Sequence, residues 1–364
     1  MNDLEALVGR ALRDPLEAAR RHAAAGGRVV GYAGAEIPVE IILASGAFAL
    51  RLPVRPELST ASADRYLESG FSPESRSLAA QYIDGAFAFL DAAVLPRSND
   101  SLQRLYYYVW ELQARGACAG PAPLIFDLAK LPRIASSLHT RRAAQRLAAE
   151  LGTAPAALPA AIERRNRRRS LFSQANRLRA DGYAFAGSTM ERIFRAADCC
   201  EPDEFDAAFA AWLSAPRPPD PRVRLVLAGN SAPDDRLHRA VELAGGNVVA
   251  EYGEHAACAF GHERPAGDSL DAIADHYWAA PIGSRAIADR AEALLAVCRS
   301  ARTDGVVIWL LEQEDAQIWD VPAQRAAVES AGLPILVLTR RSWLADDEAL
   351  ERIAEFTRDL GATR

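Results

Sequence analysis

One pattern occurs twice in this chain and constrains its fold more than any other feature. In residues 29–52 an apolar run leads into Ala33-Gly34-x-x-x-Pro38, a short helical stretch that ends at Gly46, and a second apolar run. Residues 222–252 repeat this order with Ala228-Gly229-x-x-x-Pro233 and end their helical stretch at Gly245-Gly246. Proline near the start of a helix and glycine just past its end are typical helix boundaries. The repetition predicts two α/β halves related by internal duplication. A chance likeness between two α/β openings is the alternative.

Apolar runs of strand length are distributed evenly over the two halves. They cover residues 28–32, 48–52, 85–90 and 123–128 in the first half, and residues 223–227, 247–251, 305–310 and 334–338 in the second. Continuous apolar strands separated by helical patterns are typical of parallel sheets with both faces covered. We therefore predict an α/β protein with two Rossmann- or flavodoxin-like domains, each built on a four-stranded parallel sheet.

The segment between the two halves has a different character. Residues 132–216 lack strand patterns and are rich in helix formers, and Arg217-Pro218-Pro219-Asp220-Pro221 is typical of a linker. Residues 1–25 form an amphipathic helical pattern. The predicted divisions are thus an N-terminal helix at 1–25, a first α/β domain at 26–131, a helical segment at 132–216 and a second α/β domain at 217–364.

Two clusters in the helical segment invite a functional interpretation. Five arginines lie within six positions, namely Arg164, Arg165, Arg167, Arg168 and Arg169. A solvated face with ion pairs is the simpler interpretation, and a docking patch for an acidic partner or a phosphate-bearing ligand is the alternative. Adjacent side chains point in different directions, so we interpret Cys199-Cys200 as packing residues rather than a chelate.

Composition excludes several classes of protein. Forty-two basic residues against forty-eight acidic ones give a net charge of −6, and no long basic block occurs, which argues against nucleic acid as the main partner. No apolar run approaches the roughly 18 residues of a membrane span. The N-terminal pattern lacks the apolar centre of a secretory signal, so we expect a cytoplasmic protein. Five scattered cysteines do not suggest a disulfide framework.

In open parallel sheets, ligands bind at the carboxyl ends of the strands. The predicted strand ends lie at residues 33–38, 99–101, 229–233, 253–255 and 312–315. No dinucleotide-binding, P-loop or nucleophile-elbow motif occurs in the chain. His255, His262 and His276 do not have the spacing of a zinc site. The acidic residues at 312–315 are interpreted by default as a solvated loop.

Several segments of the chain nevertheless resemble one family. They are residues 31–53, in which Pro38, Glu40 and Gly46 match recurrent positions, and residues 98–116, 152–182, 223–255 and 304–338. In these segments the chain resembles subunits of the (R)-2-hydroxyacyl-CoA dehydratase and benzoyl-CoA reductase family. The resemblance implies a heterodimer of similar subunits that binds an acyl-CoA between domains. It also implies an electron supplied by an ATP-hydrolysing activator, and dehydration or ring reduction by one-electron chemistry.

The chain departs from the family at the positions that matter most for that chemistry. Members usually hold a [4Fe–4S] cluster through three cysteines, and the corresponding positions here are Asn99, Glu254 and Glu314. An amide and two hard carboxylates are poor substitutes for thiolates around iron and sulfur. Cys258 lies four residues after the second position, but one cysteine cannot hold a cubane. We therefore expect no cofactor on this chain and a [4Fe–4S] cluster on a partner subunit.

Three hypotheses remain open from the sequence. The first is a cluster-free subunit that pairs with a cluster-bearing homologue and contributes to an acyl-CoA site. The second is a non-redox acyl-CoA-binding or regulatory protein that kept the cleft and lost the cluster. The third is an altered active site in which Glu254 and Glu314 bind a hard metal or act as acid and base; loop residues that only fill space are its alternative. Strand-end geometry nominates Pro38, Glu40 and Ser231 for substrate binding.

Overall fold

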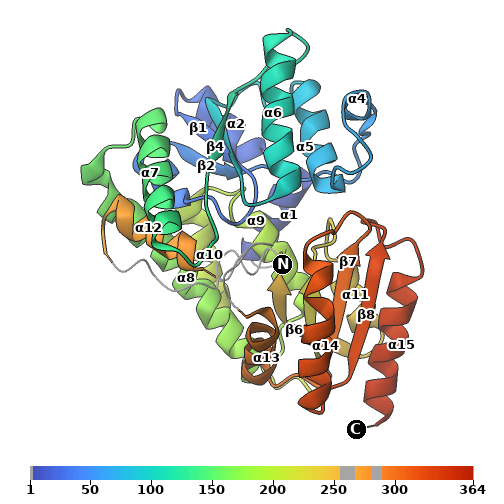
Figure 1. Cartoon of the computed structure of the whole chain (residues 1–364). Helices are drawn as coiled ribbons and strands as arrows, with labels where there is room; N and C mark the ends of the chain where they lie inside the picture. Colours follow the sequence, from blue (N-terminus) through green and yellow to red (C-terminus); the bar gives the residue numbers. More distant parts are fainter. Residues whose placement is uncertain (1–2, 255–266, 281–288, 364) are drawn as a thin grey trace. The chain divides into compact units, whose positions relative to one another are not determined.

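The computed structural model describes residues 3–254, 267–280 and 289–363 (Figure 1). The chain divides into two compact units. The first comprises residues 1–169, 196–207 and 262–287, and the second comprises residues 170–195, 208–261 and 288–364. Residues 132–216, predicted as a separate helical segment, are thus divided between the two units.

The first unit is built on a four-stranded parallel sheet. Its strands are β1 (Val29–Tyr32), β2 (Phe48–Arg51), β3 (Ala92–Pro96) and β4 (Ala122–Phe126), in the order β2-β1-β3-β4. Val30 lies opposite Ala49 of β2 and Ala92 of β3. The crossovers contain α3 (Val39–Ala44), α4 (Ala61–Asp64), α5 (Pro73–Ile83) and α6 (Asp100–Ala114).

The predicted strand at residues 85–90 is wrong, because that segment forms turns and the strand follows at Ala92–Pro96. Residues 85–90 and 92–96 are both apolar, and Asp91 lies between them. The Asp91 carboxylate accepts a hydrogen bond of 2.7 Å from the backbone N–H of Val29, which fixes the start of β3 beside β1. Phe87 is buried in the turn and packs edge-on against Tyr82. The turn has an apolar sequence because Phe87 is buried, and this apolar sequence resembles that of a strand.

The predicted N-terminal helix consists of two helices, α1 (Asp3–Arg13) and α2 (Glu17–Ala24). Pro15 lies between them and has no backbone N–H to continue the first helix. The Asp14 carboxylate accepts a hydrogen bond from the N–H of Leu16 at the break.

The helical middle of the chain forms long helices, as its periodicity predicts. They are α7 (Ile134–Leu151), the 3-10 turn η1 (Pro155–Ala157), α8 (Leu158–Ala180), α9 (Gly187–Ala196) and α10 (Pro202–Leu213). Cys199 and Cys200 lie in the segment between the end of α9 and the start of α10. In the first unit α7 packs against α12 (Leu270–Ala279), and Arg141 forms a two-pronged ion pair with Asp275.

The second unit repeats the topology of the first. Strands β5 (Val223–Gly229), β6 (Gly246–Gly253), β7 (Gly305–Leu311) and β8 (Ile335–Arg341) are parallel and have the order β6-β5-β7-β8. Helices α11 (Arg236–Leu243) and α15 (Ala349–Ala362) cover one face, while α13 (Arg290–Ala301) and α14 (Val321–Ser330) cover the other. The short turn η3 (Gln317–Trp319) precedes α14.

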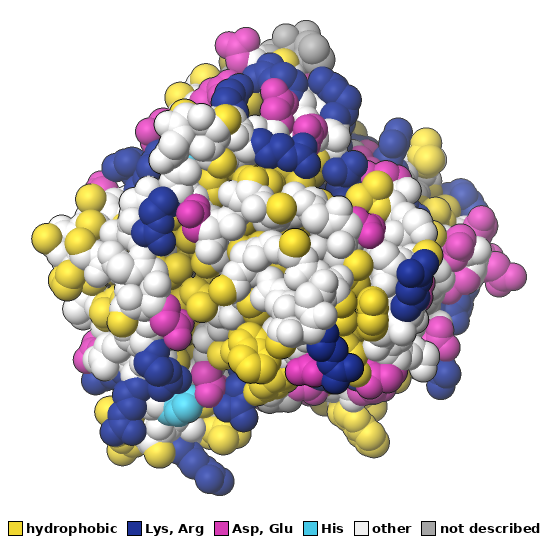
Figure 2. Space-filling view, turned by 90° about the horizontal axis from the view of Figure 1, so that it is seen from above, with side chains coloured by type: hydrophobic (Ala, Val, Ile, Leu, Met, Phe, Trp, Pro, Cys, Tyr) yellow, Lys and Arg dark blue, Asp and Glu magenta, His cyan; other side chains and the backbone are white. Residues whose placement is uncertain are grey.

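The structure confirms the predicted α/β architecture of two four-stranded parallel sheets. In each sheet the first and third strands are neighbours, and the chain leaves them in opposite directions, so β1/β3 and β5/β7 mark the topological switch points. In the space-filling view, acidic and basic side chains are interspersed on the visible face (Figure 2). Among the described helices, none is both long and apolar enough to cross a membrane.

Candidate functional site

Three polar residues meet at the carboxyl edge of the second sheet. Asn230 directly follows β5, Glu254 directly follows β6, and Glu314 lies three residues after β7. Strands β5 and β7 flank the switch point, so the loops after them and after β6 open on the same edge. The parallel topology thus brings together two of the positions that the sequence singled out, Glu254 and Glu314.

The carboxamide of Asn230 links the two carboxylates. Its Nδ2 donates a hydrogen bond of 2.8 Å to Oε2 of Glu254 and another of 2.8 Å to Oε2 of Glu314. Its Oδ1 accepts a hydrogen bond of 2.9 Å from the N–H of Leu311, and this backbone donor fixes the orientation of the amide. Since both carboxylate oxygens lie 2.8 Å from one nitrogen, they cannot be farther apart than twice that distance.

Further donors from its own loop hold the Glu314 carboxylate. Oε1 accepts from the N–H groups of Ala316 and Gln317, at 2.9 and 2.8 Å, and Oε2 accepts from the Gln317 side-chain amide at 3.0 Å. Glu314 therefore closes the turn that leads into η3. Its neighbours Glu312 and Asp315 are exposed, as the solvated-loop interpretation predicts.

Two glycines permit the close approach of β5 and β6 at this edge. Gly229 and Gly253 both have positive φ, +101° and +109°, and a Cβ on Gly253 would lie 2.4 Å from the carbonyl oxygen of Gly229. Only glycine fits such a contact. The same carbonyl accepts a hydrogen bond of 2.9 Å from the N–H of Glu254, which fixes the start of the Glu254 loop.

Asn99, the third position of interest, caps a helix in the first unit. Its Oδ1 accepts a hydrogen bond of 3.0 Å from the N–H of Leu102 at the start of α6. This is the ordinary role of asparagine before a helix.

The donor set does not fit an iron–sulfur cluster. The positions that the resemblance assigns to the three cysteines supply an N-cap amide and two carboxylates that are hydrogen-bonded to Asn230. Within the described residues, no group of three or more His, Cys, Asp or Glu side chains is arranged to hold a metal ion. Cys258, His255 and His262 lie outside the described residues.

The four described cysteines are buried and unsuited to ligation or nucleophilic chemistry. Burial raises the pKa of Cys199, Cys200, Cys298 and Cys118, to about 12 for Cys200 and about 11 for Cys298. A thiol with a raised pKa is a poor source of thiolate. The interpretation of Cys199 and Cys200 as packing residues is confirmed.

Two of the residues nominated for substrate binding, Pro38 and Glu40, lie at the start of α3. Pro38 is the N-cap residue. Glu40 is completely buried, lies 2.6 Å from a guanidinium nitrogen of Arg169, and accepts a hydrogen bond of 3.0 Å from the Tyr277 hydroxyl. Burial raises the pKa of the Glu40 carboxyl, but the charges of Arg169 and Arg165 outweigh it, so the pKa lies below its ordinary value.

The third nominee, Ser231, is held by Arg195. Its hydroxyl accepts a hydrogen bond of 2.9 Å from Nη2 of Arg195, and Nη1 of the same arginine donates to the carbonyl of Pro233. Arg195 also forms a 2.7 Å ion pair with Glu191 one turn earlier in α9. These contacts order the loop after β5. Substrate binding by Pro38, Glu40 and Ser231 stays a prediction.

The arginine cluster of α8 is largely internal, so the solvated-face interpretation is wrong for three of its five members. Arg165, Arg168 and Arg169 are buried, whereas Arg167 is exposed. Asp198 accepts from Arg165 at 2.9 Å and from Arg168 at 3.1 Å, and Arg168 also binds Asp206 at 2.7 Å. The helical periodicity could not reveal these partners, since they lie some thirty or more residues away.

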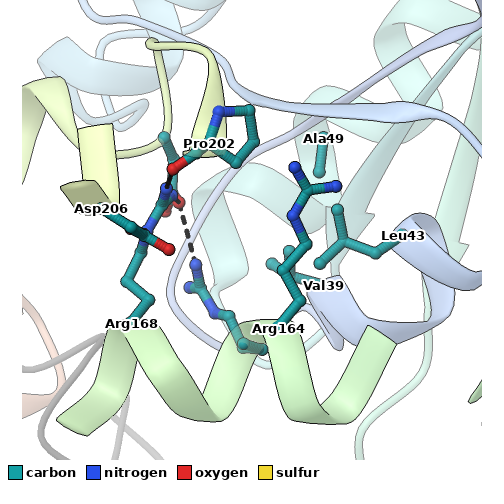
Figure 3. Close-up of a pocket in the computed structure, with 9 residues that line it drawn as sticks. Val39, Leu43, Ala49, Arg164, Arg168, Pro202 and Asp206 are labelled. Atoms are coloured by element: carbon teal, nitrogen blue, oxygen red, sulfur yellow. Dashed lines mark hydrogen bonds and ion pairs between the residues drawn. The ribbon is translucent and has the colours of Figure 1, made fainter. Parts of the chain in front are cut away.

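Three arginines of the cluster, Arg164, Arg165 and Arg168, line a small pocket of the first unit (Figure 3). In this view Arg164 extends toward Leu43 and Ala49, while Arg168 turns toward Pro202 and Asp206. Burial raises the pKa of Asp198, but the charges of Arg165 and Arg168 overcome it and lower the pKa to about 2. The Tyr32 hydroxyl also donates to Asp198, at 2.5 Å. The acids of this pocket are therefore neutralised within the chain.

The sequence matches the model of a known protein family. The model of the family described as 2-hydroxyglutaryl-CoA dehydratase, D-component, matches residues 35–357. No curated protein was found to match the chain. The matched range includes Glu254, Glu314 and Asn230.

Proposed function

The chain belongs to the family of the 2-hydroxyglutaryl-CoA dehydratase D-component, and on that premise we propose that it is a cluster-free component of a dehydratase-type assembly. In this proposal it pairs with a homologous subunit that holds a [4Fe–4S] cluster, and the pair acts on an acyl-CoA. An ATP-dependent activator would supply the electron to the partner. Dehydration is the reaction that the family description favours, and ring reduction is the less direct possibility.

The observation that supports this proposal is the Asn230 bridge. In a cluster-bearing subunit, thiolates would occupy the loops after β6 and β7. Here Glu254 and Glu314 occupy them, and Oε2 of each accepts a hydrogen bond from the same Asn230 amide. A closed network of hydrogen bonds stabilises the edge of the sheet without a metal. The fold can therefore persist in a subunit that has no cluster.

Within such an assembly, the residues of this chain would bind, orient and exchange protons. The carboxylates of Glu254 and Glu314 are suited to proton transfer rather than to electron transfer. We assign the acid–base role to Glu254 and Glu314 together; in the described part of the chain Glu314 accepts three hydrogen bonds besides that of Asn230. Glu40 and Ser231 are each engaged by an arginine, which suits residues that hold the binding loops in place.

Iron and acid-labile sulfide analysis tests the proposal directly. The chain would be purified anaerobically, alone and after co-expression with cysteine-bearing homologues from the same genome. We expect no iron in the chain alone and a cluster in a co-purified complex, visible by absorption spectroscopy. Roughly four irons per isolated chain would contradict the argument from the ligands.

Acid–base participation needs a separate comparison. In the active complex, Glu254→Gln is expected to lower kcat by about 10²- to 10⁴-fold if Glu254 transfers a proton. Glu312→Gln changes an exposed acid in a neighbouring loop and serves as the matched control. Failure of the chain to join any complex, combined with tight acyl-CoA binding by the chain alone, would favour the non-redox binding protein.

A further inference from the structure

One buried acid of the first unit differs from all the others. Five described acidic residues are classed as buried, and four of them form ion pairs with arginine, namely Glu40, Glu191, Asp198 and Glu251. The fifth, Glu36, is 5% exposed and has no hydrogen bond or ion pair among the described residues. An unpaired buried carboxylate is costly, because the protein does not replace the water that it loses.

A second polar group without a partner lies at the same edge of the sheet. Ser98 is 2% exposed, and its hydroxyl has no hydrogen-bond partner in the described part of the chain. Glu36 follows β1 and Ser98 follows β3, the two strands that flank the switch point of the first sheet. Ligands of open parallel sheets bind at this place.

Gly34 brings these two strand ends together. It has φ of +79°, and a Cβ at this position would lie 3.2 Å from Oε2 of Glu36 and 3.0 Å from Cγ of Pro96, the last residue of β3. The absence of a side chain at residue 34 therefore leaves room for the Glu36 carboxylate against the end of β3. The backbone geometry and the orphaned groups are independent observations that indicate the same place.

We propose that Glu36 and Ser98 form a subsite for a hydrogen-bond-donating group, a hydroxyl or an ammonium, on the acyl chain of a CoA thioester. An ionised carboxylate can only accept hydrogen bonds, and a serine hydroxyl can both accept and donate. A donor group on the ligand would satisfy both, and an ammonium would also neutralise the carboxylate. The acyl-CoA part of this inference rests on the proposed function.

The first test asks whether the charge of Glu36 destabilises the folded chain when no ligand is bound. Glu36→Gln removes the charge with little change in shape and is expected to raise the thermal midpoint. The matched variant Glu40→Gln breaks an ion pair with Arg169 and is expected to lower it. If Glu36→Gln also lowers the thermal midpoint, groups of the folded chain stabilise the Glu36 carboxylate without a ligand. That result would overturn the proposal.

The second test measures binding with thioesters of equal size. Butyryl-CoA, 3-hydroxypropionyl-CoA and 3-aminopropionyl-CoA differ only in a terminal methyl, hydroxyl or ammonium group, and pentanoyl-, 4-hydroxybutyryl- and 4-aminobutyryl-CoA extend the series by one carbon. Calorimetric titration of the chain and of its complex is expected to show about tenfold tighter binding of a donor-bearing member over its methyl counterpart. The preferred member distinguishes a hydroxyl ligand from an ammonium ligand.

The variants connect this preference to the proposed residues. Glu36→Gln is expected to reduce the preference to less than about twofold, and Ser98→Ala is expected to reduce it in part. If the methyl, hydroxyl and ammonium members of each series bind equally tightly, the subsite is overturned, but the chain still binds acyl-CoA. Absence of binding by any thioester, to the chain and to its complex, would instead overturn the proposed function and the subsite together.

Discussion

The guanidinium of Arg169 lies 2.6 Å from the carboxylate of Glu40, and both side chains are buried. Arg169 is in α8, whereas Glu40 is in the first turn of α3, next to the loop that follows β1. The pair therefore connects the long helix to the switch point of the first sheet. Such pairs stabilise a fold chiefly because breaking them leaves a buried charge.

Arg169→Met is expected to lower the free energy of unfolding by about 3–5 kcal/mol, since Glu40 would then be buried without its main cation. The double variant Arg169→Met/Glu40→Leu is expected to regain most of this loss, because it removes both charges. Denaturant unfolding of the full chain measures both effects. Arg10→Ala, which breaks an exposed pair with Glu204, is the control and is expected to cost less than about 1 kcal/mol. Equal losses in the single and double variants would contradict this account.

Asp198 predicts a specific response to acid. Its pKa of about 2 in the folded chain lies below the value of about 3.9 for an unfolded aspartate. Its contribution to stability is therefore fully present above pH 4 and is lost as the pH falls from about 4 to about 2. We expect the stability difference between wild type and Asp198→Asn to shrink by about 2 kcal/mol over this interval, measured by denaturant unfolding at each pH. A constant difference would show that Asp198 is not held ionised by Arg165 and Arg168.

The architecture was predictable because it depends on patterns that are local in sequence. Seven of the eight predicted strands occur where the apolar runs lie, and their parallel order follows from the intervening helices. The third strand was misplaced because the buried turn at Phe87 and the strand at Ala92–Pro96 are both apolar. The hydrogen bond from the Val29 N–H to the Asp91 carboxylate fixes the start of the strand after Asp91. The two residues lie far apart in the sequence, so no local pattern predicts this bond.

The sites were only partly predictable, for a related reason. The rule that ligands bind at the carboxyl ends of parallel strands identified the loops of Glu254 and Glu314. It could not show that Asn230 donates a hydrogen bond to both carboxylates. The signal was present in principle, since Asn230 is the first polar residue after a buried strand. Glu36 was missed because a lone acid in a loop has no pattern, and its burial becomes visible only in three dimensions.

The buried cysteines predict selective protection from alkylation. At pH 8 in the native chain, iodoacetamide is expected to modify Cys199 and Cys200 at least about a hundredfold more slowly than in the unfolded chain, because burial suppresses both access and thiolate formation. Mass spectrometry of digested protein measures each site. Samples unfolded in guanidinium give the reference rates. Rapid native modification of either thiol would contradict the packing role.

Because the Asn230 amide donates hydrogen bonds to both Glu254 and Glu314, we expect that aspartate cannot replace Asn230. Asn230→Asp exchanges the donor Nδ2 for an oxygen between two carboxylates, so we expect a loss of about 2–4 kcal/mol in unfolding free energy at pH 7. The loss is expected to diminish below pH 4, where the carboxyl groups take up protons. Asn99→Asp makes the same substitution at the N-cap of α6, where aspartate caps as well as asparagine, and is expected to be nearly neutral. Equal effects of the two substitutions would show that Asn230 does not hold Glu254 and Glu314 together.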